Sequence, residues 1–171
     1  MQEQLKLDNQ LCFRLYTASR LITQAYHPLL SRIGLTYPQY LVMMVLWERD
    51  EMPVNDIAKK LYLETNTVTP LLKRMEAEGF LTRNKGKADA RQVIVKLTPK
   101  GRELESRAGC IPFQLGEAMA CRSITPETAP GLYGTLDDLI HTLSEDAKQE
   151  GHPPALFVSS LQQRKPKPKK G

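Results

Sequence analysis

Residues 55–101 read NDIAKKLYLETNTVTPLLKRMEAEGFLTRNKGKADARQVIVKLTPKG, and the spacing of their apolar residues changes along the segment. Two short helices joined by a tight turn are expected first, with Asn55 as the cap of the first one. Pro70 has no N–H for the helix ladder, so the second helix is expected to begin near Asn66 or Thr67, or to have a distorted first turn. One face of this helix is apolar and is expected to be buried: Val68, Leu71, Leu72 and Met75.

After Gly79, a typical helix stop, helical spacing gives way to alternation. Segments 81–85 and 91–97 predict two strands joined by the turn 86–89, with Val93, Val95 and Leu97 alternating against Gln92, Ile94 and Lys96. Two helices followed by a basic hairpin are typical of a winged helix-turn-helix. The predicted fold class is therefore mainly α with a small β-hairpin wing (α+β).

The chain before this segment predicts a long amphipathic helix. Apolar residues recur every three or four positions over 11–29, and Asp8 is the expected N-cap. The pair His27-Pro28 and then Gly34 are expected to end or kink this helix.

Capping signals predict where the other helices begin. The expected starts are Thr36 with Gln39, Thr98 with Pro99, and Thr125 with Pro126. The apolar run 40–47 predicts a central helix that is buried nearly all round. The helix that begins at Pro99 is expected to run towards Cys121 with a kink at Pro112.

Length and composition suit one compact domain with a tail. The chain has 171 residues and a mass of 19.4 kDa, with 41% hydrophobic and 25% charged residues. We expect an N-terminal dimerisation and sensor helix (1–34), a winged helix-turn-helix domain (35–98), C-terminal dimerisation helices (99–150) and a disordered basic tail (151–171).

No signal peptide or membrane-crossing run is evident, so a cytoplasmic protein is expected. Three scattered cysteines predict neither a disulfide scaffold nor a zinc site, and we expect no metal or other cofactor.

Positive charge is concentrated in two places. Residues 55–103 carry eleven Lys/Arg and six Asp/Glu, and residues 164–170 carry five Lys/Arg and no acid. This distribution favours binding to a polyanion, and the tail is expected to add nonspecific affinity. The candidate DNA-binding residues of the second short helix are Thr65, Asn66, Thr67, Thr69, Pro70, Lys73 and Arg74. Those of the hairpin are Arg83, Lys85, Lys87, Asp89 and Arg91.

Two motifs resemble MarR-type transcriptional regulators. Asp89-Ala90-Arg91 followed by Leu97-Thr98-Pro99-Lys100-Gly101 resembles their wing, and the run 71–76 resembles their recognition helix. The resemblance implies a homodimer whose first and last helices interlock, with each subunit binding half of a pseudo-palindromic site on double-stranded DNA. It further implies that Asp89 braces the wing by pairing with a basic neighbour while Arg91 reaches the minor groove. The competing interpretation is a solvated basic face with a hairpin that only covers the core.

The segments 11–16, Tyr26 and 35–40 resemble the organic-hydroperoxide-sensing (OhrR-type) branch of these regulators. The resemblance implies that Cys12 is the peroxide-reactive residue and that Tyr26 and Tyr37 hydrogen-bond to it. It further implies that Cys121, or alternatively Cys110, is the resolving thiol of an intersubunit disulfide. Arg14 departs from the smaller apolar residues usual in this branch.

The position of Cys12 near a helix start independently favours a thiolate, because the aligned peptide dipoles stabilise an anion there. Tyr16 is one turn away and can donate to the sulfur within the same chain. Tyr26 lies fourteen residues further on, about 21 Å along a helix, so it can meet Cys12 only from another subunit. The alternative is that Cys12 is merely a small buried hydrophobe.

These observations predict a DNA-binding transcriptional regulator, most simply a repressor, which releases its operator when an organic hydroperoxide oxidises Cys12. A second hypothesis is a MarR-type regulator released by a reversible phenolic or lipophilic ligand. A thiol peroxidase is a third, but the sequence has no nucleophile elbow, phosphate-cradling Gly loop or metal set, so we expect no enzymatic turnover.

Overall fold

The computed structural model describes residues 2–86, 89–119 and 124–149. Two short 3₁₀ segments come first, η1 (Glu3–Leu5) and η2 (Leu7–Asn9). The helices are α1 (Leu11–Ser31), α2 (Tyr37–Glu48), α3 (Val54–Lys60), α4 (Thr65–Ala77), α5 (Pro99–Ala108), α6 (Ile111–Met119) and α7 (Ala129–Gln149). The strands are β1 (Met52–Pro53), β2 (Leu81–Lys85) and β3 (Val93–Leu97). The predicted fold class, mainly helical with a small wing, is confirmed.

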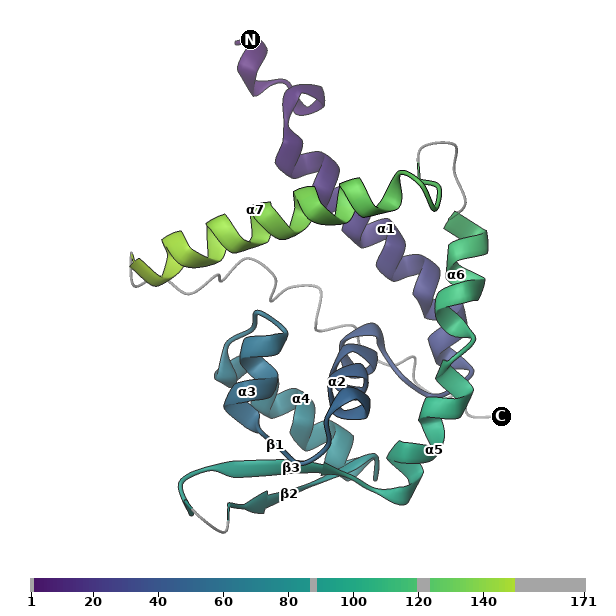
Figure 1. Ribbon diagram of the computed structural model, residues 1–171, viewed down its shortest axis with the longest axis vertical. Coiled ribbons are helices and arrows are strands. Elements are labelled where there is room, and N and C mark those ends of the chain that lie inside the picture. Colours follow the sequence, from purple (N-terminus) through teal and green to yellow (C-terminus); the bar gives the residue numbers. More distant parts are fainter. Residues whose placement is uncertain (1, 87–88, 120–123, 150–171) are drawn as a thin grey trace, which may run out of the picture.

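The sheet has three antiparallel strands in the order β1-β3-β2. The hairpin register pairs Leu81 with Leu97 and Lys85 with Val93, and β1 adds Met52 opposite Val95. Figure 1 shows α2, α3 and α4 gathered over this sheet, while α1, α6 and α7 lie on the other side of the molecule. The hairpin agrees with the prediction, whereas the short strand β1 was not predicted from the sequence.

The core lies between the sheet and helices α2 to α4. Val42 and Met43 of α2, Ile57 of α3 and Leu72 of α4 are completely or almost completely inaccessible to solvent. The expected central helix is confirmed, since α2 buries residues on nearly every side. Gln39, buried at the start of α2, accepts the backbone N–H of Thr36 as the capping pattern predicts.

The first helix begins and ends differently from the prediction. Asp8 belongs to η2 and is not the cap; Gln10 precedes α1 and makes no side-chain capping bond. The helix continues through Pro28 to Ser31, and the chain then turns at Gly34, whose φ is +75°. A proline inside a helix loses one hydrogen bond, and α1 remains helical here although Pro28 is exposed.

Three further helix boundaries differ from the expectations. Asn55 lies inside α3, which begins at Val54, so it is not the cap. Helix α4 begins at Thr65 and includes Pro70 in its second turn. The single kinked helix expected after Thr98 is two helices, α5 and α6, separated at Gly109 and Cys110, so Pro112 falls in the first turn of α6, where proline is tolerated.

The last helix begins at Ala129, not directly after Thr125-Pro126. Thr98, in contrast, is confirmed as a cap, since its side-chain oxygen accepts the N–H of Gly101 at 3.1 Å. None of the helices in the described part of the chain combines the length and the apolar character that a membrane span requires. Lys87, Cys121 and the basic tail 151–171 lie outside the described residues.

Candidate nucleic-acid interface and thiol site

Helix α4 has one buried and one open face. Val68, Leu71, Leu72 and Met75 pack into the core, as the spacing predicts. The exposed residues on the opposite side are Thr65, Asn66, Pro70, Lys73 and Arg74, and Thr67 and Thr69 are half-buried beside them. A protruding helix of this kind has the width to enter the DNA major groove, with its N-terminal half against the bases.

Hydroxyl groups fix the start of α4. The Thr65 hydroxyl donates to Asn55 Oδ1 of α3 at 3.1 Å, which ties the two helices of the motif together. The Thr69 hydroxyl donates to the Thr65 carbonyl at 2.7 Å, and that of Thr67 donates to Asn66 Oδ1 at 3.2 Å. The three threonine side chains predicted to contact DNA are thus held in place by local hydrogen bonds.

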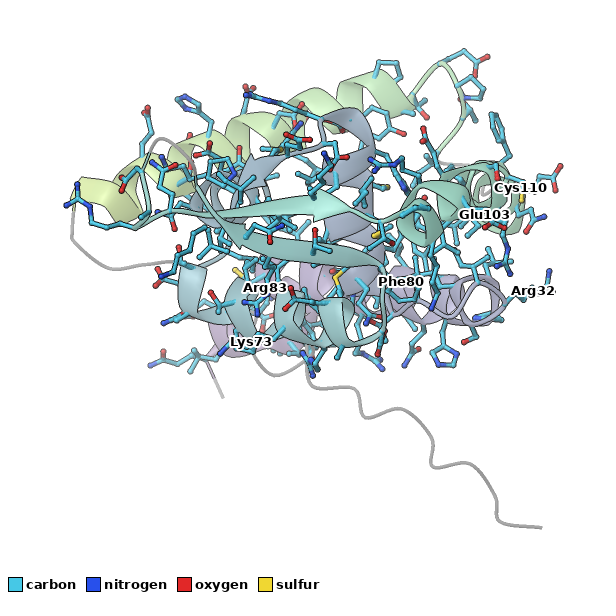
Figure 2. All side chains as sticks on the ribbon, turned by 90° about the horizontal axis from the view of Figure 1, so that it is seen from below. Arg32, Lys73, Phe80, Arg83, Glu103 and Cys110 are labelled. Atoms are coloured by element: carbon cyan, nitrogen blue, oxygen red, sulfur yellow. The ribbon has the colours of Figure 1, made fainter. Side chains whose placement is uncertain are left out.

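Arg83 of the wing is directed at α4. Its Nε and a terminal guanidinium nitrogen donate to Glu76 Oε2 at 3.0 and 2.8 Å, and its backbone N–H donates to Glu76 Oε1 at 2.8 Å. Figure 2 shows Arg83 in the same part of the molecule as Lys73 of α4. We therefore assign Arg83 a positioning role, because its charge is used to fasten the hairpin to the recognition helix.

Sequence reasoning did not single out Glu76. The alternation of side chains along a strand indicates this contact. Arg83 lies two residues after the buried Leu81, so both side chains are on the face of β2 that packs against the helices. The hydrogen bonds from Arg83 hold the pKa of the Glu76 carboxyl below its ordinary value, although partial burial opposes them.

A Glu76→Gln variant is expected to be less stable than the wild type at pH 7, by about 1 kcal/mol. A lowered carboxyl pKa contributes stability above the unfolded-state pKa, about 4.5, and that contribution is lost as the pH falls through the lower folded-state value. The difference in melting temperature between the two proteins should therefore shrink below about pH 4.5. Glu105→Gln, on an exposed part of α5, is the control; a gap that stays constant down to pH 2 would contradict the assignment.

The wing tip is basic and open. Arg91 has a side chain that is 93% exposed, and Lys85 is also exposed. Asp89 accepts the Arg91 backbone N–H at 2.9 Å and lies 3.3 Å from its Nε. Asp89 thus pairs with a basic neighbour inside the turn, and that neighbour is Arg91 itself.

The two described cysteines are both exposed. Cys12 is the second residue of α1, and Tyr16, one turn later, is also exposed. Cys110 lies between α5 and α6, and Figure 2 shows it at one edge of the view beside Glu103, away from Lys73 and Arg83. The position of Cys12 at the helix start agrees with the prediction, and within one chain its thiol is exposed and not packed in the core.

Tyr26 and Tyr37 lie together near the far end of α1. Their ring centroids are 4.9 Å apart, and Tyr40 adds a third ring at 5.8 Å from Tyr26. Burial raises the pKa of Tyr26, and burial together with the neighbouring Tyr26 raises that of Tyr37. Both hydroxyls are therefore protonated at neutral pH and able to donate a hydrogen bond.

This aromatic cluster does not meet Cys12 within one chain. Tyr26 and Cys12 lie on the same continuous helix, fourteen residues and about 21 Å apart. The structure thus brings Tyr26 to Tyr37, as the prediction requires, and leaves Cys12 at the other end of α1.

Large apolar side chains are exposed along α1 and α7. They are Leu11, Phe13, Tyr16 and Leu21 of α1, and Leu132, Tyr133, Ile140 and Leu143 of α7. None of residues 129–145 is buried, and Figure 1 shows α7 crossing α1 away from the sheet. Apolar surface of this extent marks an interaction face.

Known proteins resemble this chain over most of its length. A family model described as transcriptional regulator SarA/Rot matches residues 24–107. The organic hydroperoxide resistance transcriptional regulator of Bacillus subtilis (strain 168) is 40% identical over 143 residues, which cover 84% of this chain and 95% of that protein.

Solved structures of AbfR, a protein of Staphylococcus epidermidis, resemble it in shape as well. Reduced AbfR bound to DNA matches with a TM-score of 0.68 and 37% identity, over 84% of this chain and 96% of that one. Disulfide-formed AbfR matches with a TM-score of 0.57 and 36% identity, over 84% and 95%.

Proposed function

Because the chain belongs to the MarR family of winged-helix transcriptional regulators, in the branch of the organic hydroperoxide resistance regulators, we propose that it is a homodimeric repressor that releases its operator when Cys12 is oxidised. The observation that carries this proposal is the arrangement of α1. An exposed thiol lies at its start, a pair of protonated tyrosines lies near its end, and exposed apolar side chains lie between them.

The apolar faces of α1 and α7 are the proposed dimer interface. If α1 of one subunit runs antiparallel to α1 of the other, each Cys12 meets Tyr26 and Tyr37 of the partner subunit. The separation of about 21 Å along α1 makes a second copy necessary for this contact. The sensor and the subunit interface are then one structure, so a change at the sulfur alters the spacing of the two α4 helices.

The proposed chemistry has two steps. The Cys12 thiolate attacks the distal oxygen of a hydroperoxide, the O–O bond breaks, and the products are Cys12 sulfenic acid and an alkoxide. A tyrosine hydroxyl of the partner subunit donates a hydrogen bond to the leaving oxygen, and water supplies its proton. A resolving thiol then displaces hydroxide from the sulfenic sulfur, which forms a disulfide and releases water. The signal is one oxidation per subunit, and we propose no enzymatic turnover.

Either Cys121 or Cys110 can supply the resolving thiol. With cumene hydroperoxide, the wild type is expected to give a dimer band on a non-reducing gel, and Cys121→Ser is expected to abolish it. Cys110→Ser is the matched control and should retain the band. A band that persists in Cys121→Ser and is lost in Cys110→Ser would assign the role to Cys110 instead.

DNA binding is proposed to combine α4 in the major groove with the wing tip in or along the minor groove. Arg91 and Lys73 are exposed basic side chains on these two elements. The slope of log affinity against log salt is negative, and each phosphate contact that is lost should reduce its magnitude by about 0.9.

The variants Arg91→Ala and Lys73→Ala are therefore each expected to reduce the magnitude of that slope by about 1, as measured by fluorescence anisotropy between low and moderate salt. Lys6→Ala, which removes a lysine paired with Glu3 outside the winged helix, is the control. An unchanged slope in both variants would remove these residues from the phosphate contacts.

A further inference from the structure

Pro70 is out of place by the ordinary rules of helix chemistry. It is the sixth residue of α4, it is exposed, and it has no N–H to donate to the carbonyl of Asn66. Pro38 and Pro99, in contrast, occupy first turns of helices, where a missing N–H costs nothing. Pro70 therefore weakens the helix in which it stands.

The packing of the protein does not explain this cost. Helix α4 packs through Val68, Leu71, Leu72 and Met75, and Pro70 lies on the opposite face. An alanine or serine at this position would restore the N–H without losing a core contact. Residues that break a local rule without a structural gain are concentrated at functional sites.

We propose that Pro70 is a specificity-determining residue that contacts the methyl group of a thymine in the operator. The proposal rests on the proposed function, since it requires α4 to lie in the major groove. The proline ring carries no hydrogen-bond donor or acceptor. Of the four bases, only thymine presents a methyl group in the major groove. The polar edges of the other bases would lose hydrogen-bonded water against the proline ring and gain no hydrogen bond in return.

The neighbours of Pro70 support this assignment. Asn66 lies one turn before it, and Lys73 and Arg74 lie one turn after it on the same exposed face. Those side chains can donate to base edges and phosphates, whereas the Thr69 hydroxyl is already donated to the Thr65 carbonyl. Pro70 is thus an apolar residue between polar residues that can contact DNA. A thymine methyl group opposite it would place a T·A pair inside the half-site.

The experiment removes only the methyl group. A duplex selected from a random pool by the reduced full-length protein is resynthesised with deoxyuridine replacing each thymine in turn, and affinities are measured by fluorescence anisotropy. At one thymine of each half-site, the wild type is expected to lose about fourfold in affinity, the equivalent of about 0.8 kcal/mol for one methyl group. Pro70→Ser should bind the thymine and uracil duplexes equally.

Pro28→Ser is the matched control, because Pro28 is also an exposed proline inside a helix but lies on α1. It should keep the fourfold discrimination. Pro70→Ser should melt at or above the wild-type temperature, which separates a lost contact from a lost fold.

Two results would overturn the proposal. One is a wild type that binds every uracil-substituted duplex as tightly as the parent, and the other is a Pro70→Ser variant that still discriminates. If no sequence-specific duplex is selected at all, the proposed function itself fails, and this inference fails with it. Loss of peroxide sensitivity alone would affect neither the selection nor the discrimination.

Discussion

A Cys12→Ser variant is expected to bind the operator as tightly as the wild type and to stay bound at a cumene hydroperoxide concentration that releases the wild type completely. A serine hydroxyl remains protonated at neutral pH and does not attack the O–O bond, so no sulfenic acid forms. DNA affinity should survive because Cys12 is an exposed residue at the start of α1, remote in sequence from α4 and the wing.

The measurement is an electrophoretic mobility shift at increasing peroxide, paired with mass spectrometry after dimedone trapping. The wild type and the control Cys110→Ser should both show a trapped sulfenic acid at Cys12 when dimedone reacts before the resolving thiol does. Release of the Cys12→Ser protein at the wild-type peroxide dose would disprove the assignment of Cys12.

A Gly101→Ala variant is expected to lose much of its stability. A Cβ atom at this position would lie 2.1 Å from the Phe80 carbonyl oxygen and 3.2 Å from Leu97 Cδ2. The Phe80 oxygen is backbone and already accepts the Thr98 N–H at 3.1 Å, so it cannot move without breaking that bond. Gly101 also accepts the Trp47 indole N–H at 3.1 Å, which links α2 to α5.

The overpacking is expected to cost roughly 3 kcal/mol or more, which corresponds to a drop in Tm of about 10 °C. Calorimetry or thermal circular dichroism checks it. Gly109→Ala is the matched control, because a Cβ there meets its nearest atoms at an ordinary 3.7 Å. A Gly101→Ala protein that melts with the wild type would show that α5 does not approach the hairpin this closely.

Much of the fold could be predicted because its signals are local. The Thr36 and Thr98 caps and the alternation in the hairpin each depend on residues a few positions apart, and all three agree with the structure. Strand β1 could not be predicted, since two residues are too few for a period and its pairing with β3 depends on distant sequence. Propensity likewise failed at Pro28 and Pro70, since α1 and α4 both continue through a proline; in α4 the buried face opposite Pro70 keeps the helix intact.

The sequence predicted single residues of the candidate site better than the contacts between them. The open face of α4 and the position of Cys12 near a helix start follow from helical spacing. Arg83 was expected to contact DNA, whereas in the structure it binds Glu76 of α4. A basic residue in a strand does not reveal its partner unless one also asks which face of the strand it occupies. The pairing of Tyr26 with Tyr37 depends on how α1 meets α2, which no local pattern specifies.

Oxidation at Cys12 is proposed to weaken the binding of the dimer to DNA. This can be measured by a fluorescence anisotropy titration of one labelled operator duplex with reduced protein, with cumene hydroperoxide-treated protein, and with treated protein returned to dithiothreitol. We expect tight binding, lost binding and restored binding in that order, with a dimer in size-exclusion chromatography throughout. Equal affinities for the reduced and the oxidised protein would contradict the account.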